Sequence, residues 1–277
     1  MKKENIQKSI CEAVKAVREK NPMAPSITNT VTVNFVANAQ LAVGGSAAMI
    51  YLPDEGESMA RLGGAFYINM GTLFPVYAET LPRTVKALAG AGTPWVLDPV
   101  GIGIGALRKD LLIQFRTCPP SILRGNASEI LAVAKLWELM KDDGETGVRG
   151  VDSTDEVEAA RGAAVAIARY IKGAVAVSGP VDLITDGETV AYSKGGSRFF
   201  PMITGAGCSL GGVMAVYASQ TSPFIAALTG AAAYNLAGAR AEAKVRGPGS
   251  FQTQFLDELY LAAAEEIAEC PMDLEKA

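Results

Sequence analysis

The stretch Ile203–Tyr217 reads ITGAGCSLGGVMAVY and joins a glycine-rich turn to an apolar segment. Within the turn, Thr204–Cys208, the small residues let the backbone approach a ligand closely. The residues that follow are apolar and contain no proline, so they predict a buried helix that starts near Cys208. Unpaired backbone N–H groups and the positive end of the helix dipole would then face one point. An anion, such as a phosphoryl group in transfer, fits that point.

Cys208 stands at the predicted start of this helix. The positive helix end is expected to lower the pKa of a thiol there and to favour thiolate. A thiolate could accept a proton from a substrate hydroxyl. The alternative is a tight turn into a core helix, with Cys208 as a small buried hydrophobe. Glycine-rich turns are common, so this stretch alone leaves both interpretations open.

The composition excludes several classes of protein. The chain has 277 residues, no histidine and a net charge of −4, and its pI is near 5.1. No run of Lys or Arg stands out, which argues against nucleic-acid binding. The absence of histidine excludes Ser-His-Asp hydrolysis, His-bound zinc and His acid–base catalysis. Any proton transfer falls to a carboxylate, Cys, Lys or Tyr.

The cysteines and the breaks in the apolar runs indicate a cytoplasmic, soluble protein. The four cysteines lie far apart without a CxxC pair, which argues against a zinc knuckle and a disulfide scaffold. Free thiols fit a reducing cytoplasm, and the charged N-terminus shows no signal peptide. The uncharged segment 199–239 is long enough to span a bilayer. Its glycines and the break at Ser219–Pro223 favour two consecutive buried helices instead, so no membrane contact is expected.

Short apolar runs alternate with helical patterns along the rest of the chain. This βαβα rhythm predicts an α/β fold, with a mostly parallel central sheet flanked by helices on both faces. No linker or internal repeat divides the chain, so we expect a single domain over residues 1–277. The predicted strands are Ala47–Tyr51, Ala65–Met70, Pro94–Leu97, Ser121–Leu123, Ala174–Val177 and Leu183–Thr185. The predicted helices include Asn5–Lys20, one entering from Thr28 or Asn29, Leu81–Ala91, Ser128–Leu139, Thr154–Ile171 and Ser250–Cys270.

Polar and glycine residues follow four of the predicted strands, where ligands collect in sheets of this kind. Asp98 and Glu129 could hold Mg²⁺, which prefers carboxylate and water, and Arg124 could clamp a phosphate. For Asn126 and Ser128 we favour a structural explanation, the N-cap of the next helix. The strand ends carry Gly71-Thr72, Asp98–Gly103, Arg124–Glu129 and Ser178-Gly179.

One further pattern predicts local structure, and the absence of two motifs argues against two classes of nucleotide-binding site. The charged segment Lys141–Glu156 predicts a surface loop and a helix start, and Ser153–Glu156 resembles a capping box. The sequence contains neither G-x-x-x-x-G-K-[ST] nor G-x-G-x-x-G. A P-loop and a Rossmann dinucleotide site are therefore unsupported.

Eight segments together resemble the hydroxyethylthiazole kinases, a family of the ribokinase-like superfamily. They occur in the family's order and spacing over nearly the full chain, and the block RGNASE at Arg124–Glu129 is the most specific. The Gly-x-Gly-Cys turn is shared with some pyrimidine and pyridoxal kinases. The segments are Ile27–Asn29, Val33-Asn34, Asn69–Thr72, Asp98–Gly101, Arg124–Glu129, Gly150–Thr154, Thr204–Cys208 and Gly247–Gln252.

This resemblance implies phosphorylation, from ATP, of the hydroxyl of 4-methyl-5-(2-hydroxyethyl)thiazole, a salvage step toward thiamine. It places Cys208 where most ribokinase-like enzymes have a catalytic Asp. It also implies a homotrimer with the site near a subunit boundary. The further positions that match are Asp98 and Glu129 for Mg²⁺, Arg124 and Ser178 for ATP, Gly207 in the turn that receives the phosphoryl group, Met49 and Gly205 for the thiazole, and Asn29 and Gly71 as weaker candidates for the same pocket.

The sequence departs from the family pattern at three places. Pro25-Ser26 and Ser197 stand where the family usually has His, and Ala206 replaces a common Thr. The first two changes could shift substrate preference, and the third removes one hydroxyl near the phosphate. The alternatives are a kinase of another small ring alcohol, of hydroxymethylpyrimidine or pyridoxal type, a nucleotide-dependent dehydratase of the same fold, and a non-catalytic sensor. Cys208 argues against the dehydratase, because those enzymes carry Asp there.

Overall fold

A single curved sheet organises the molecule. The computed structural model describes residues 2–140 and 154–277, and within them nine strands follow the order β2-β1-β3-β4-β5-β6-β7-β8-β9. The strands are β1 (Met23–Ile27), β2 (Ser46–Met49), β3 (Phe66–Asn69), β4 (Trp95–Asp98), β5 (Ile122–Asn126), β6 (Ala174–Ser178), β7 (Val181–Thr185), β8 (Thr189–Lys194) and β9 (Met272–Lys276).

The sheet has a parallel part and an antiparallel part. From β2 through β6, neighbouring strands run parallel, whereas β7, β8 and β9 pair antiparallel. The carboxyl ends of the first six strands therefore meet at one edge, which is where sheets of this kind bind ligands. The mostly parallel α/β sheet predicted from the sequence is confirmed.

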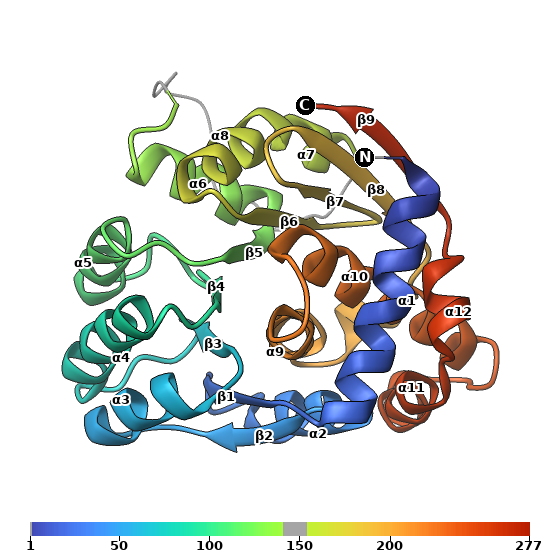
Figure 1. The fold of residues 1–277 in the computed structure, drawn as a ribbon, viewed down its shortest axis with the longest axis horizontal. Coiled ribbons are helices and arrows are strands. Elements are labelled where there is room, and N and C mark those ends of the chain that lie inside the picture. Colours follow the sequence, from blue (N-terminus) through green and yellow to red (C-terminus); the bar gives the residue numbers. More distant parts are fainter. Residues whose placement is uncertain (1, 141–153) are drawn as a thin grey trace.

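Helices cover both faces of the sheet and create two separate apolar cores. Side chains of α3 to α8 pack on one face, and those of α1, α2 and α9 to α12 pack on the other. Figure 1 shows the sheet curving around α9 and α10. The helices are α1 (Lys3–Lys20), α2 (Val33–Ala42), α3 (Pro53–Leu62), α4 (Tyr77–Ala91), α5 (Ala106–Phe115), α6 (Ala127–Leu136), α7 (Thr154–Ala159), α8 (Arg161–Ile171), α9 (Ala206–Ala218), α10 (Pro223–Glu242), α11 (Pro248–Leu261) and α12 (Ala264–Ala268).

The two helices α9 and α10 lie in the hollow of the sheet, as the uncharged segment 199–239 predicts. Apolar residues occupy all sides of both helices, which is the pattern of helices with no solvent face. Glycines bring α9 close to its neighbours: a Cβ at Gly212 would lie 2.9 Å from a methyl carbon of Val36. Among the described residues, no helix is both long and apolar enough to cross a membrane.

All six strands predicted from the apolar runs are present, with ends shifted by at most three residues. The sequence missed β1, because Pro25 lacks the N–H that a central strand donates. The helix expected to enter from Thr28 or Asn29 begins only at Val33, after Thr32 as N-cap. That expectation was wrong because the Asn29 side chain bonds to Asn69 and Cys208 instead of capping a helix.

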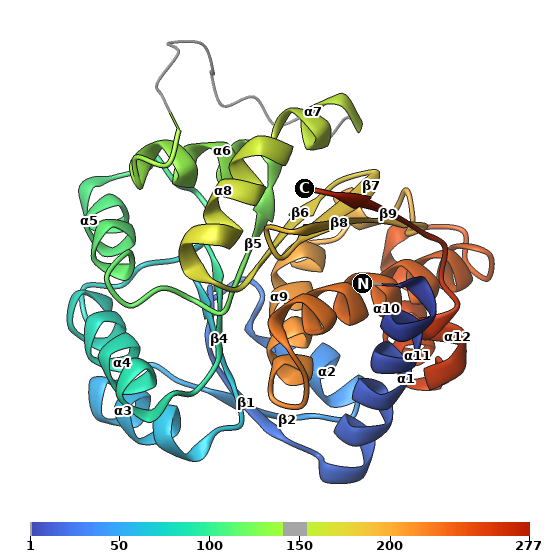
Figure 2. The ribbon, with the colours of Figure 1, turned by 45° about the horizontal axis from the view of Figure 1, so that its top comes forward.

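Other elements also differ from the expectations. The strands β8 and β9 were not predicted; the edge strand β9 is short and charged, which protects an exposed sheet edge. The expected C-terminal helix divides after Leu261, Ala263 has an extended backbone, and α12 follows with its own cap. The expected helix Thr154–Ile171 divides into α7 and α8. The predicted loop from Lys141 and the capping box at Ser153 lie outside the described residues. Figure 2 shows β9 at the sheet edge beside the N-terminal end of α1.

Candidate active site

Polar side chains from five parallel strands meet at the carboxyl edge of the sheet. Asn69 and Asp98 end β3 and β4, where the two residues pair in register. Ser178 ends β6 beside Asn126 of β5, and Asn29 follows β1. The convergence that the sequence predicted for these strand ends is present.

Asp98 lies at the centre of this group and is fully buried. Its Oδ2 atom accepts three hydrogen bonds: from the Tyr67 hydroxyl at 3.1 Å, from Asn69 Nδ2 at 3.0 Å and from Arg124 Nη1 at 3.1 Å. Its Oδ1 atom is buried and has no hydrogen-bond partner among the described residues. One carboxylate oxygen is thus saturated, while the other is left without a donor.

Arg124 joins Asp98 to the end of β6. Its Nη2 donates to Ser178 Oγ at 3.0 Å, while its Nε is buried and has no acceptor in the described part of the chain. Burial by itself would lower the pKa of this guanidinium, but Asp98 and Glu129 outweigh burial and raise that pKa. The guanidinium also lies against α9, because a Cβ at Gly207 would stand 2.7 Å from Nη2. Only glycine leaves room for Arg124 at this position.

Glu129 caps helix α6 and also contributes a carboxyl group to the site. Its side chain accepts the N–H of Asn126 at 2.9 Å, and Asn126 Oδ1 accepts the N–H of Glu129 at 2.9 Å. The two residues form the capping box of α6, so the structural role expected for Asn126 is confirmed. Ser128 Oγ also donates to Asn126 Oδ1.

Both carboxyl groups are less acidic than exposed ones. Burial raises the pKa of Asp98, and Arg124 with the hydrogen bonds from Tyr67 and Asn69 opposes that rise. Burial and the charge of Asp98 raise the pKa of Glu129, against Arg124 and backbone donors. Two buried carboxyl groups that repel each other are stabilised when a cation is placed near them.

The turn before α9 presents backbone donors to this group. Gly205, the N-cap of α9, has φ of +93°, a left-handed conformation that favours glycine. Within the described part of the chain, the N–H groups of Ala206, Gly207 and Cys208 have no backbone or side-chain acceptor, whereas Ser209 N bonds to Gly205 O. The helix start near Cys208 is confirmed, and its open N-terminus is suited to an anion, whose binding there stays a prediction.

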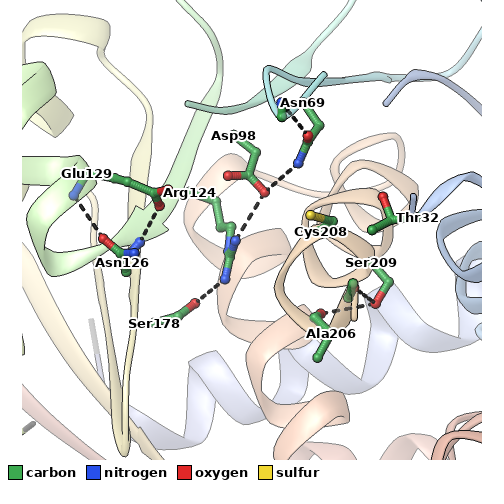
Figure 3. A network of polar contacts seen from close by, with 12 residues as sticks. Thr32, Asn69, Asp98, Arg124, Asn126, Glu129, Ser178, Ala206, Cys208 and Ser209 are labelled. Carbon is green, nitrogen blue, oxygen red and sulfur yellow. Dashed lines mark hydrogen bonds and ion pairs between the residues drawn. The ribbon is translucent and has the colours of Figure 1, made fainter. Parts of the chain in front are cut away.

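Cys208 projects from the first turn of α9 toward the Asp98–Arg124 pair, as Figure 3 shows. Asn29 Nδ2 lies 3.3 Å from its Sγ and 3.0 Å from Asn69 Oδ1. Burial, followed by the charge of Asp98, raises the pKa of the Cys208 thiol, and Arg124 and Asn29 only partly oppose them. The expectation of a lowered pKa was therefore wrong, because it rested on the helix end alone and left out burial in the folded site.

Two of the predicted substrate positions, Asn29 and Gly71, both contact Asn69. Gly71 N donates to Asn69 Oδ1 at 2.9 Å, and a Cβ at Gly71 would stand 2.9 Å from Asn29. A Cβ at Gly205 would stand 2.8 Å from a methyl group of Thr32. Met49 ends β2, paired with Ser26 of β1. Met49 and Cys208 are both partly buried and both pack against the core that contains α9.

A cavity of about 560 Å³ opens beside Arg124 and Ser178. Ala206 and Gly207 of α9 line this cavity, and so does Asn235 of α10. This volume is within the range of pockets that enclose small organic ligands. The further lining residues are Gly179, Pro180, Asp182, Gly195, Gly196, Ser197, Arg198, Phe200, Pro201, Leu210, Tyr234 and Glu242.

The site includes two residues for which the sequence predicted no role, Tyr67 and Asn69. Asn69 Nδ2 donates to the Tyr67 hydroxyl at 3.0 Å, in addition to Asp98. The signal for Asn69 was present, because it is a polar residue at the end of an apolar strand. Tyr67 lies inside β3 and is indistinguishable in sequence from an ordinary core tyrosine.

The chemistry of the site fits Mg²⁺ bound with phosphates rather than a metal held by protein alone. The described residues contain no group of three or more His, Cys, Asp or Glu that could hold a metal. Asp98 offers the unpartnered Oδ1, and Glu129 is the second carboxylate. Mg²⁺ is commonly held by one or two carboxylates together with waters and substrate phosphates.

Comparison with known proteins is consistent with this geometry. The model of the "Hydroxyethylthiazole kinase family" matches residues 14–265. The chain belongs to the hydroxyethylthiazole kinase family. It is 48% identical to a hydroxyethylthiazole kinase of Bifidobacterium longum over 95% of this chain and 90% of that protein. A hydroxyethylthiazole kinase structure from Pyrococcus horikoshii OT3 superposes with a TM-score of 0.85 at 30% identity, covering 98% and 99% of the two chains.

The fold is that of the ribokinase-like superfamily. A ribokinase-like protein from Enterococcus faecalis superposes with a TM-score of 0.58 at 11% identity, covering 94% of each chain, which concerns the fold alone. Of the departures from the family pattern, Ser26 accepts a hydrogen bond from Gln40 inside the fold. Ser197 donates to Glu242 at 2.7 Å and lines the cavity.

Proposed function

We propose that this member of the hydroxyethylthiazole kinase family transfers the γ-phosphoryl group of ATP to the hydroxyl of 4-methyl-5-(2-hydroxyethyl)thiazole. One observation carries the proposal. The open N-terminus of α9 and Cys208 lie directly beside the buried Asp98–Arg124 pair. Phosphoryl transfer needs positioning and stabilisation of charge more than covalent chemistry from the protein. This constellation supplies both.

ATP would bind on the Ser178 side of the site. The cavity beside Arg124 leads to Gly207 and the free N–H groups of α9, which would hold the transferring phosphoryl group. Arg124 and Ser178 would contact the phosphates, because the guanidinium retains a donor at Nε that no described residue accepts. Mg²⁺ would be held at Asp98 and Glu129 and would offset the negative charge of the phosphates.

The thiazole alcohol would bind on the opposite side of Cys208. Asn29 contacts the thiol directly, Gly71 and Asn29 share Asn69 as a partner, and Gly205 lies in the turn that precedes Cys208. Met49, at the end of β2, would pack on the ring. The hydroxyl oxygen forms a bond to the γ-phosphorus while the bond from that phosphorus to the ADP oxygen breaks.

Cys208 would accept the proton that leaves the hydroxyl. Only the thiolate can accept it, and burial keeps the thiol protonated over more of the pH range. The nearby Arg124 and Asn29 act in the other direction and favour thiolate. The proposal therefore predicts a rate that increases with pH.

We further infer that the enzyme works in the cytoplasm as a homotrimer, with no nucleic-acid or membrane partner. The four cysteines are free, as expected for thiols in a reducing compartment. Large apolar side chains are exposed in loops at the carboxyl edge of the sheet, among them Val31 and Ile104. A contact between subunits near the site would cover these side chains.

Release of ADP from Mg-ATP should be measured with a panel of acceptors. We expect kcat/KM for the hydroxyethylthiazole to exceed that for hydroxymethylpyrimidine and pyridoxal by at least about 100-fold, roughly 2.7 kcal/mol. An equal or higher value for either of the other two alcohols would reject the assigned substrate while retaining the kinase. No ADP release with any alcohol would reject the kinase function.

A further inference from the structure

The two oxygens of the Asp98 carboxylate have opposite environments. Three donors from two strands converge on Oδ2, and none of the described residues donates to Oδ1. A carboxylate bound in this way has little freedom to rotate. Its free oxygen therefore keeps a fixed direction inside a fully buried site.

The donor contributed by Tyr67 has a defined orientation. Asn69 Nδ2 donates to the phenol oxygen at 3.0 Å, so the hydroxyl hydrogen is left for Asp98 Oδ2 at 3.1 Å. Asn69 in turn is held at its own oxygen by the N–H of Gly71 and by Asn29. Gly71 and Asn29 thus donate to Asn69, Asn69 donates to Tyr67, and Tyr67 donates to Asp98, so each of these polar groups has a hydrogen-bond partner.

Tyr67 also supports helix α9. A Cβ at Gly211 would stand 2.8 Å from the Tyr67 hydroxyl oxygen, and a Cβ at Gly207 would stand 2.7 Å from Arg124 Nη2. The two glycines are one helical turn apart and lie on the same face of α9. This face therefore rests on Tyr67 and Arg124, and both of these side chains donate to the same oxygen of Asp98.

We propose that Tyr67 is a positioning residue, which fixes the Asp98 carboxylate for a divalent cation and sets its distance from the N-terminus of α9. This inference rests on the proposed function, because it assumes that a metal–nucleotide complex binds between Asp98 and α9. Tyr67 contacts neither reactant. Its effect reaches the site through Asp98 on one side and through Gly211 on the other.

The variant Tyr67→Phe removes the hydroxyl and keeps the ring that packs against Gly211. Mn²⁺, as a stand-in for Mg²⁺, is titrated into protein with ADP, and free Mn²⁺ is followed by electron paramagnetic resonance. We expect the Kd of Mn²⁺ to rise by about 10- to 100-fold, the usual effect of losing a residue that orients a metal ligand. The turnover of Tyr67→Phe should be reduced at low Mg²⁺ and should partly recover at saturating Mg²⁺. The KM of the thiazole alcohol should change less than about twofold.

The control is Tyr217→Phe, which makes the same change at a buried residue at the other end of α9. It should leave the Kd of Mn²⁺ unchanged. If wild type binds Mn²⁺ with ADP and Tyr67→Phe binds it equally well, the positioning role is rejected while the proposed function stands. If wild type fails to bind Mn²⁺ with ADP, the proposed function fails, and this inference fails with it.

Gly211→Ala gives a second test that leaves the hydroxyl in place. Its methyl group would overlap a ring carbon of Tyr67 and stand 2.8 Å from the hydroxyl oxygen, so the whole side chain must shift and the Kd of Mn²⁺ should again rise. A folded Gly211→Ala protein with wild-type Mn²⁺ affinity would overturn the claim that Tyr67 links α9 to Asp98. Circular dichroism and melting temperature establish folding in each variant.

Discussion

At the scale of single residues, the site is governed by burial. Cys208 lies at a helix N-terminus, where a thiol is expected to ionise easily, yet burial raises its pKa. The sequence indicates that Asp98, Arg124 and Ser178 come together, because polar residues after apolar strands are visible in a single chain, but it does not indicate Tyr67. The direction of the pKa shift is not visible, because it depends on how much of the fold covers the thiol.

Cys208→Asp should keep at least about a third of the wild-type kcat, because a carboxylate is a competent base in this place. Cys208→Ala should lower kcat by about 100-fold or more. Steady-state kinetics with the thiazole alcohol and Mg-ATP measure both. Equal, near-total loss in the two variants would reject Cys208 as the base.

The pH dependence follows from the raised pKa of Cys208. Because the thiolate population grows as pH rises toward that pKa, kcat/KM of the wild type should increase from about pH 7 to about pH 9. In Cys208→Asp the carboxyl is largely ionised at neutral pH, so the rise should disappear or move to lower pH. A wild-type profile that is flat or falls over this range would contradict proton transfer to Cys208.

Arg124→Lys keeps the charge but cannot bridge Asp98 and Ser178 as the planar guanidinium does. The KM of ATP should rise by about tenfold, or about 1.4 kcal/mol, with a smaller change in the KM of the alcohol. Arg124→Met removes the charge beside a fully buried carboxylate and should destabilise the protein by about 3–5 kcal/mol. Urea unfolding separates this loss of stability from the kinetic effect.

At the scale of elements, α9 connects the fold to the site. Its apolar sequence predicts burial, which is confirmed. Its glycines lie close to neighbouring side chains, and the close approach of a ligand stays a prediction. The neighbours that fill the space above those glycines cannot be read from the sequence, since they come from β3, β5 and α2. The strand β1 was missed because Pro25 cannot donate a backbone hydrogen bond and so argues against a strand, yet the fold tolerates it there.

Gly207→Ala should test the packing of α9 on Arg124. Its Cβ would stand 2.7 Å from Nη2, so the guanidinium must move away from Ser178, and the KM of ATP should rise by about tenfold or more. Gly90→Ala in α4 is the matched control, because no described atom lies within 4 Å of the place that its Cβ would take. An unchanged KM of ATP in Gly207→Ala would contradict the contact between α9 and the nucleotide side of the site.

At the scale of the whole molecule, one sheet joins the two apolar cores, which supports the proposal that the chain folds as a single domain. Trp95 and Trp137 both belong to the core on the side of α3 to α8. Tryptophan fluorescence therefore reports one core, whereas far-UV circular dichroism reports all helices. We expect the two signals to give the same urea midpoint, and separate midpoints would indicate two independent units.

The assembly is tested by light scattering coupled to gel filtration. A homotrimer should give a mass three times the 28.9 kDa of the chain. Val31, which is exposed at the edge of the sheet where the site lies, should matter for assembly, so Val31→Glu should lower the measured mass. A wild-type protein of single-chain mass would reject the trimer.

The central claim is tested most directly by mass-spectrometric detection of phosphorylated 4-methyl-5-(2-hydroxyethyl)thiazole after incubation with Mg-ATP. The comparison is with Asp98→Asn, which keeps the shape of the side chain at the centre of the site and removes its charge. We predict the phosphorylated product with wild type and at least about a 100-fold lower yield with folded Asp98→Asn. Absence of product with wild type, while both thiazole and ATP bind, would contradict the proposed reaction.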